Sequence, residues 1–172
     1  MANKNEESAG VYSAGIKQLS NNIIDLLIKH NLSVALAESC TGGSVCGELT
    51  GIAGAGNVVA GGINTYMTRT KIEILGVKKE IIDNFGVVSE PCAKEMALNA
   101  LKMFKSDIAV SVTGYLGPDG GDMFAQAGTV FIAVASLDGI SLVSFKFDSL
   151  DRADNKSVTV QRVLQHLLSC LS

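Results

Sequence analysis

One stretch of the sequence combines hydroxyl side chains with consecutive glycines, since residues 38–43 read Glu-Ser-Cys-Thr-Gly-Gly between a strand-like segment and a helical pattern. A helix N-terminus offers free backbone N–H groups and the positive end of the helix dipole, which together attract anions. Gly42 and Gly43 would let a phosphate or carboxylate approach the backbone. The hydroxyls of Ser39 and Thr41 would donate further hydrogen bonds to the bound anion. The alternative interpretation is that Ser39 or Thr41 caps the helix and binds no ligand.

A second stretch of the same kind lies further along the chain. Thr113 and Gly114 follow an apolar segment at residues 108–112, and a glycine-rich turn, Gly-Pro-Asp-Gly-Gly, occupies residues 117–121. Such a turn is also ordinary loop chemistry, because glycine, proline and aspartate all favour turns. Thr113 nevertheless occupies the same strand-end position as Ser39, so we expect the two hydroxyls to face one cleft.

Three further side chains could take part in chemistry at that cleft. Tyr66 and Lys71 flank a strand-to-helix junction, and a lysine shielded from water can have its pKa lowered enough to act as a base. Arg152 follows the last predicted strand and can pair with a phosphate group. Taken alone, Lys71 and Arg152 are also side chains of the kind that any protein surface carries.

The elements that position these residues follow from the hydrophobic periodicity. Short apolar runs predict strands, and apolar residues at spacings of three and four predict helices. Ser89 is suited to cap a helix with Pro91 in its first turn, and Asp138-Gly139 predicts a hairpin turn. The predicted strands are residues 33–37, 61–66, 108–112, 129–135 and 140–147, and the predicted helices are residues 16–27, a helix opened by residues 38–43 that continues through Leu49, and residues 70–75, 78–85, 90–104 and 160–171.

Strands that alternate with helices over the first two thirds of the chain, followed by a hairpin and a helix, predict an α/β fold. We expect one layered domain, at residues 12–172, with a mixed, partly parallel sheet flanked by helices, and a flexible N-terminal tail at residues 1–11. In such a sheet the loops after the carboxyl ends of the parallel strands gather at one edge, where ligands bind. Of the 18 glycines, eight fall within residues 42–62 and five within residues 114–128, on loops of that kind.

The composition excludes several classes of protein. With a net charge of −3, three arginines and no tryptophan, the chain lacks the basic patch and the stacking platforms that bind nucleic acid. It contains no apolar run of the ~18 residues that a membrane span needs, and its polar start carries no secretory signal. We therefore expect a cytoplasmic protein that acts on a small molecule and forms a homo-oligomer through apolar helix faces.

The four cysteines and two histidines argue against a metal centre. The cysteines, at positions 40, 46, 92 and 170, show no CxxC spacing, and no histidine stands beside them at ligand spacing. Reduced thiols of a cytoplasmic protein explain them. No metal and no cofactor is predicted.

Taken together, the motifs resemble those of the CinA C-terminal domain family, the nicotinamide-nucleotide amidohydrolases also called PncC. They follow the family's order across roughly residues 19–171, which is nearly the whole chain. The motifs are Ala37-Glu-Ser-Cys-Thr-Gly-Gly43, Thr65-Tyr66 followed by Lys71, Gly86-Val-Val-Ser-Glu-Pro91, Ser111-Val-Thr-Gly114, Gly117-Pro-Asp-Gly-Gly121 and Gly128-Thr-Val130.

The resemblance implies a stand-alone enzyme that needs no metal and that recycles pyridine nucleotides. It would hydrolyse the carboxamide of nicotinamide mononucleotide to nicotinic acid mononucleotide and ammonia. Carried over by motif, its site residues are Ser39, Tyr66, Lys71, Thr113 and Arg152. Lys71 or Tyr66 would accept the hydroxyl proton, backbone N–H groups of the glycine loops would stabilise the oxyanion, and the anion site would hold the 5′-phosphate.

One departure from the family pattern opens an alternative. Family members carry Gly-Ser-Ser after the second helix, where the second serine is a candidate nucleophile, whereas this chain reads Gly54-Ala55-Gly56. Glycine supplies neither a nucleophile nor a base. Either Ser39 carries the chemistry, or a water activated by Lys71 does, or the chain is a catalytically impaired protein that binds pyridine nucleotides. A structural or interaction protein of this fold with no ligand is the third possibility.

Overall fold

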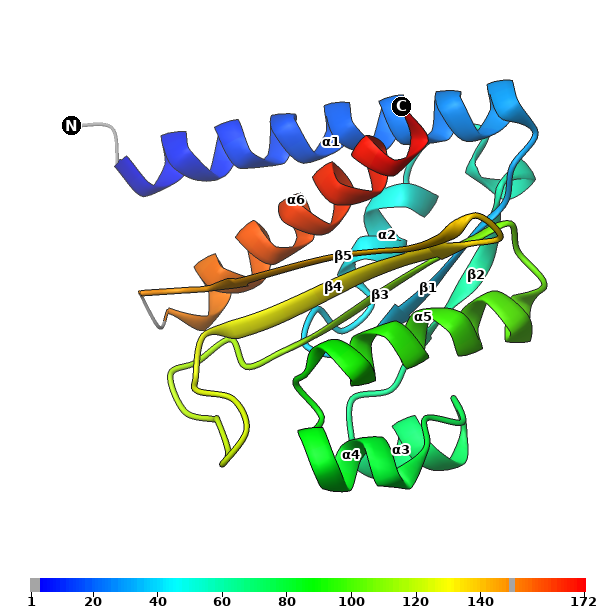
Figure 1. Cartoon of the computed structure of the whole chain (residues 1–172). Coiled ribbons are helices and arrows are strands. Elements are labelled where there is room, and N and C mark those ends of the chain that lie inside the picture. The colour runs from blue at the N-terminus through cyan, green and yellow to red at the C-terminus, as the bar shows by residue number, and fades with distance from the viewer. Residues whose placement is uncertain (1–3, 149–150) are drawn as a thin grey trace.

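The computed structural model describes residues 4–148 and 151–172, with side chains from residue 14 onward. The chain forms an α/β domain of three layers, in which one sheet lies between two sets of helices (Figure 1). The elements are α1 (Lys4–His30), β1 (Val34–Glu38), α2 (Ser44–Thr50), η1 (Ala55–Asn57), β2 (Val59–Asn64), α3 (Thr68–Glu73), α4 (Lys79–Phe85), α5 (Glu90–Phe104), β3 (Ile108–Gly114), β4 (Thr129–Ser136), β5 (Gly139–Lys146) and α6 (Arg152–Leu171).

The sheet is mixed, with strand order β2-β1-β3-β4-β5. The first three strands are parallel, and β4 and β5 run antiparallel to their neighbours. The carboxyl ends of β1, β2 and β3 therefore share one edge of the sheet, where β4 also begins and β5 ends. The fold class predicted from the sequence, a mixed and partly parallel sheet flanked by helices, is confirmed.

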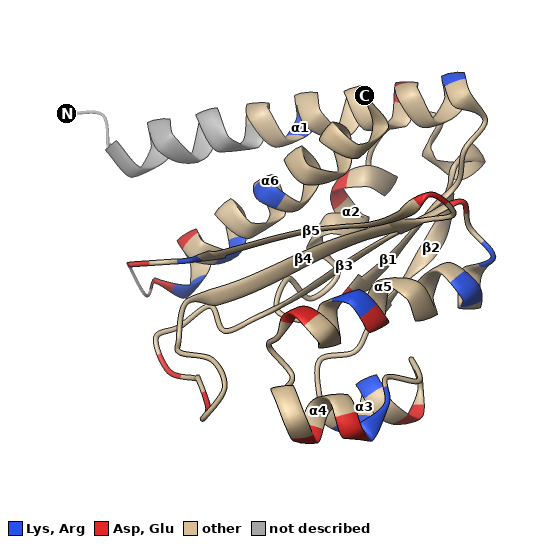
Figure 2. Cartoon of the chain, in the orientation of Figure 1, with Lys and Arg blue, Asp and Glu red and all other residues tan. Residues whose placement is uncertain are grey.

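The two faces of the sheet are covered by different helices. Helices α1, α2 and α6 pack on one face, and α5 packs on the other with α3 and α4 beyond it (Figure 1). Strand β1 carries five consecutive buried residues, as expected of a strand with a helix layer on each side. Figure 2 shows that charged residues cluster on the helices and loops, whereas β3 and β4 carry none.

Local sequence explains where several elements begin. The Ser89 side chain caps α5 by accepting a hydrogen bond from the N–H of Cys92, and Pro91 lies in the first turn, as predicted. The β4–β5 hairpin turns at Leu137-Asp138, one residue earlier than predicted, and Gly139 begins β5 with a φ of 142° that suits glycine. Both signals depend on neighbouring residues alone, which is why the sequence reveals them.

Several boundaries differ from the predictions. Helix α1 begins at Lys4, so residues 4–11, predicted as a tail, are helical, because each residue added to an established helix gains a hydrogen bond and no proline interrupts the segment. Residues 1–3 lie outside the described part. Helix α6 begins at Arg152 instead of near residue 160, since the Asp151 side chain caps it by accepting from the N–H of Asp154. Strand β2 spans Val59–Asn64, two residues earlier than expected, with an irregular register at its start.

The helices were also considered as possible membrane spans by their length and apolar character. Among the residues that the structure describes, none of the helices has both the length and the apolar character to span a bilayer.

Candidate active site

A cavity of about 250 Å³ opens at the edge of the sheet where the parallel strands end. Most of the predicted site residues line it, although they come from five separate segments of the chain. The lining residues are Ser39, Cys40, Tyr66, Lys71, Val87, Val88, Thr113, Gly114, Tyr115, Leu116, Asp119 and Arg152. The shared edge of the sheet brings these segments together: Ser39 follows β1, Tyr66 follows β2, and Thr113 lies near the end of β3.

The central contact of the cavity joins Ser39 to Lys71. The Lys71 Nζ lies 2.9 Å from the Ser39 Oγ and also donates a 2.6 Å hydrogen bond to the carbonyl oxygen of Thr65. Thr65 directly follows β2, and Lys71 lies one turn into α3, so the strand-to-helix junction directs the lysine back over the sheet edge. The result is a hydroxyl paired with an amine, which is the arrangement that activates a serine as a nucleophile.

Burial sets the protonation chemistry of this pair. The Lys71 side chain is 2 % exposed, and its removal from water lowers its pKa below the usual 10.5. No carboxylate forms an ion pair with it among the described residues. A lysine in this setting can lose its proton and then accept one from Ser39. By contrast, burial raises the pKa of the neighbouring Cys40 thiol to about 12, so that thiol stays protonated and is a poor nucleophile.

Tyr66 and Arg152 form the mouth of the cavity. The Arg152 guanidinium donates a 2.6 Å hydrogen bond to the Tyr66 Oη and a 3.3 Å bond to the carbonyl oxygen of Gly117. Tyr66 is 58 % exposed, and its hydroxyl contacts the arginine rather than Ser39 or Lys71. Of the two proton acceptors considered from the sequence, Lys71 is thus the one in contact with the serine.

Thr113 lies deeper, at the floor of the cavity. Its Oγ1 donates a 2.8 Å hydrogen bond to the carbonyl oxygen of Val87, which fixes the hydroxyl and leaves its lone pairs able to accept. The cavity thus combines a serine–lysine pair, an oriented hydroxyl and a cation at its mouth.

The structure gives the glycine-rich loop after β1 a different role from the one expected. The buried carboxylate of Glu38 folds back over the N-terminus of α2 and accepts 2.6, 2.9, 3.2 and 2.8 Å hydrogen bonds, from the Thr41 hydroxyl and from the N–H groups of Gly43, Val45 and Cys46. The donors expected to receive an external anion are therefore taken by an anion of the chain itself. Thr41, Gly42 and Gly43 accordingly lie outside the residues that line the cavity.

The profile of the CinA C-terminal domain family matches residues 16–171. The chain belongs to this family. A CinA-like protein of Fervidobacterium nodosum is 44 % identical over 135 residues, covering 78 % of this chain and 33 % of the relative. One from Flavobacterium psychrophilum is 40 % identical over 138 residues, covering 77 % and 33 %. The chain thus matches about a third of the length of these curated relatives.

Solved CinA structures share the fold of the chain. The competence/damage inducible protein CihA of Agrobacterium tumefaciens has a TM-score of 0.86 at 36 % sequence identity, with 90 % of this chain and 94 % of that chain covered. A CinA superfamily protein of Escherichia coli has a TM-score of 0.87 at 30 % identity, with 90 % of both chains covered. The match with these two proteins thus extends over nearly their whole chains.

The Gly54-Ala55-Gly56 segment, which departs from the CinA pattern, lies outside the residues that line the cavity. Gly56 belongs to η1, which leads into the amino end of β2, whereas Ser39 follows the carboxyl end of the parallel strand β1. A strand of five residues at about 3.3 Å per residue separates the two ends by roughly 16 Å. Gly56 does not line the cavity, so its missing side chain removes no group from the Ser39–Lys71 pair of this chain.

Several cavity residues of this CinA domain escaped the sequence analysis as site residues. Val87, Val88 and Asp119 lie inside motifs that carry the resemblance, so the motifs already pointed to them. Tyr115 and Leu116 directly follow Gly114 and have no signal beyond that position. Within the described ranges, nowhere do three or more His, Cys, Asp or Glu side chains gather as a metal ion would need.

Proposed function

We propose that the chain is an amidase that hydrolyses the carboxamide of nicotinamide mononucleotide to nicotinic acid mononucleotide and ammonia. The observation that carries this proposal is the 2.9 Å contact between Ser39 and the buried amine of Lys71 inside a cavity. Membership of the CinA C-terminal domain family supports it, because the motifs of that family supply the cavity residues.

In the proposed reaction, the neutral Lys71 amine accepts the Ser39 hydroxyl proton while the oxygen attacks the carboxamide carbon. The resulting tetrahedral oxyanion needs hydrogen-bond donors. Cys40 lines the cavity, and within the described part of the chain its backbone N–H donates to no other residue, so this group is assigned to the purpose. The protonated lysine then returns its proton to the leaving nitrogen, which departs as ammonia.

The second half of the reaction repeats the first with water as the nucleophile. Lys71 accepts a proton from a water molecule, whose oxygen attacks the acyl-serine carbon. Collapse of the second tetrahedral intermediate releases the carboxylic acid and returns the proton to the Ser39 oxygen. One water is consumed, one C–N bond breaks and one ammonia leaves.

Substrate binding is assigned to the polar groups around this pair. Arg152 uses two of its five N–H donors on Tyr66 and Gly117, so others remain for the 5′-phosphate, which a guanidinium binds well. The Thr113 hydroxyl accepts a hydrogen bond from the carboxamide nitrogen. Burial of the cavity floor keeps water away from the amine and so favours its neutral form.

The direct test is ammonia release from nicotinamide mononucleotide by the wild-type chain and by Ser39→Ala, Lys71→Met and Lys102→Met. Lys102 is an exposed lysine on α5 and is the matched control. We expect turnover in the wild type and the control and a loss of at least a thousandfold in the other two variants. Saturating substrate that yields no ammonia with wild-type protein, despite raising its melting temperature, would instead identify a nucleotide-binding protein.

Hydroxylamine separates the serine route from direct attack by a lysine-activated water. An acyl-serine reacts with hydroxylamine to give a hydroxamate, detectable by mass spectrometry, at the expense of the acid. We expect the hydroxamate with wild-type protein. Ammonia release with acid as the only other product would assign the attack to water.

A further inference from the structure

Asp119 and Arg152 carry opposite charges on the wall of one cavity, and neither neutralises the other. Asp119 is the one acidic side chain among the lining residues, and it forms no hydrogen bond or ion pair within the described part of the chain. Arg152 contacts a tyrosine hydroxyl and a backbone carbonyl instead of a carboxylate. Both charged side chains are therefore able to contact a ligand bound in the cavity.

Among the described residues, no hydrogen bond or ion pair joins Asp119 to the reactive lysine. Burial lowers the pKa of Lys71, and the neighbouring thiols of Cys92 and Cys40 offset part of that change. A carboxylate that tuned this amine would raise its pKa and so oppose its use as a base. Because Asp119 lies on the cavity wall and does not contact the amine, its side chain is placed to meet a bound ligand.

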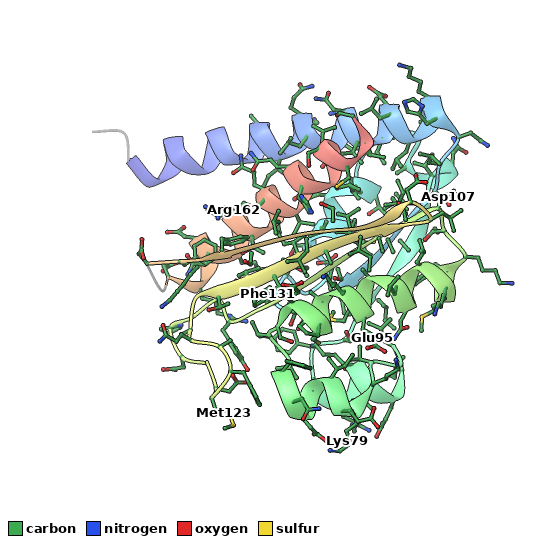
Figure 3. The ribbon with its side chains drawn as sticks, in the orientation of Figure 1. Lys79, Glu95, Asp107, Met123, Phe131 and Arg162 are labelled. Atoms are coloured by element: carbon green, nitrogen blue, oxygen red, sulfur yellow. The ribbon has the colours of Figure 1, made fainter. Side chains whose placement is uncertain are left out.

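The backbone around Asp119 holds it at this wall. It lies in the turn at residues 117–121, where Gly120 has a φ of 116° and packs against the Tyr115 ring, so that a Cβ at Gly120 would stand 3.2 Å from a ring carbon. Tyr115 in turn donates a 2.9 Å hydrogen bond to Asp122. Figure 3 shows Met123, which is 90 % exposed, projecting from the tip of the same loop; Asp119 is also exposed to solvent, on the part of the loop that lines the cavity.

We infer that Asp119 is a specificity residue that faces the positive charge of the pyridinium ring, while Arg152 holds the phosphate. The inference rests on the proposed function and narrows its substrate class to amides whose ring bears a permanent positive charge. Opposite charges about 5 Å apart near a protein surface favour binding by roughly tenfold or more. A dihydropyridine nucleotide, which has the same ribose and phosphate but a neutral ring, gains nothing from Asp119.

The test compares the two charge forms of the nucleotide in wild type, Asp119→Asn and Asp138→Asn. Asp138 is an exposed aspartate in the β4–β5 turn, at the opposite end of the sheet, and is the matched control. For Asp119→Asn we expect KM for nicotinamide mononucleotide to rise about tenfold with kcat within twofold, and the inhibition constant of the reduced mononucleotide to stay unchanged. The preference for the charged form should also weaken as salt is added.

Equal weakening of both forms in Asp119→Asn would overturn the inference, because it would assign the carboxylate to the ribose hydroxyls. No change in either form would overturn it as well. Calorimetric binding of the two forms to wild type and Asp119→Asn gives the same comparison without turnover. A chain that releases no ammonia but loses its preference for the charged form on Asp119→Asn would refute the amidase and keep the inference.

Discussion

Replacing Lys71 with methionine should abolish catalysis while leaving the fold intact. The side chain is 2 % exposed and methionine has a similar length, so the cavity floor stays filled. The change removes the hydrogen bonds to Ser39 and Thr65, which contribute about 1 kcal/mol each. It also removes a buried amine, whose charged form costs several kcal/mol in desolvation. We therefore expect an unfolding free energy within about 2 kcal/mol of wild type, or above it.

The loss in activity should be far larger than any change in stability. Without the amine, Ser39 has no proton acceptor in contact with it, and the loss of a general base next to a nucleophile costs about 10⁴-fold, or ~5 kcal/mol of transition-state stabilisation. Ammonia release and urea denaturation on the same preparations measure the two effects. A Lys71→Met protein that retains more than a tenth of wild-type activity, or that is unfolded at 25 °C, would refute this reasoning.

The pH dependence of stability gives a second readout of the same residue. Because burial lowers the pKa of Lys71 below 10.5, the folded protein holds fewer protons than the unfolded chain between the lowered pKa and 10.5. Stability must therefore rise with pH across that window, and the rise must vanish in Lys71→Met. Activity should also rise with pH as the amine loses its proton. Identical pH slopes in the two proteins would contradict the assignment of a neutral lysine.

Three further predictions concern other parts of the fold. Glu38→Ala should lower the unfolding free energy by about 3–5 kcal/mol, because it leaves buried donors at the start of α2 without an acceptor; a loss below 1 kcal/mol by urea denaturation would contradict this. Gly56→Ser should change ammonia release by less than twofold, since a Cβ there meets nothing within 4 Å and the position lies outside the cavity; a tenfold gain would show that it reaches the site. Ser89→Ala should cost about 1 kcal/mol through loss of the α5 cap, and thermal denaturation unchanged from wild type would argue against that cap.

The features that sequence reasoning recovered are those that neighbouring residues determine. Ser89 with Pro91 marks the start of α5, and Asp138-Gly139 marks the hairpin, because capping and turn formation involve side chains and dihedrals within a few positions. The grouping of Ser39 and Thr113 at one edge also followed from the sequence, since parallel strands place their carboxyl ends together.

The features that sequence reasoning missed depend on contacts between distant residues or on side-chain direction. Glu38 reads as one more polar residue after a strand, and nothing in its neighbourhood shows that its carboxylate turns back over α2. Ser39 and Lys71 are 32 positions apart in the sequence, so no local pattern reveals their contact, and only the family resemblance suggested it. The separation of Gly56 from the cavity likewise needs the direction of β2, which the sheet pairing supplies.

The position of Ser39 at the end of β1 also bears on how the protein loses activity. Strand β1 is hydrogen-bonded to β2 on one side and β3 on the other, and its five residues are buried. Backbone amides in such a strand exchange with solvent only when the whole domain opens. The geometry around Ser39 should therefore persist until the domain unfolds cooperatively, so that thermal inactivation and loss of the sheet follow the same curve.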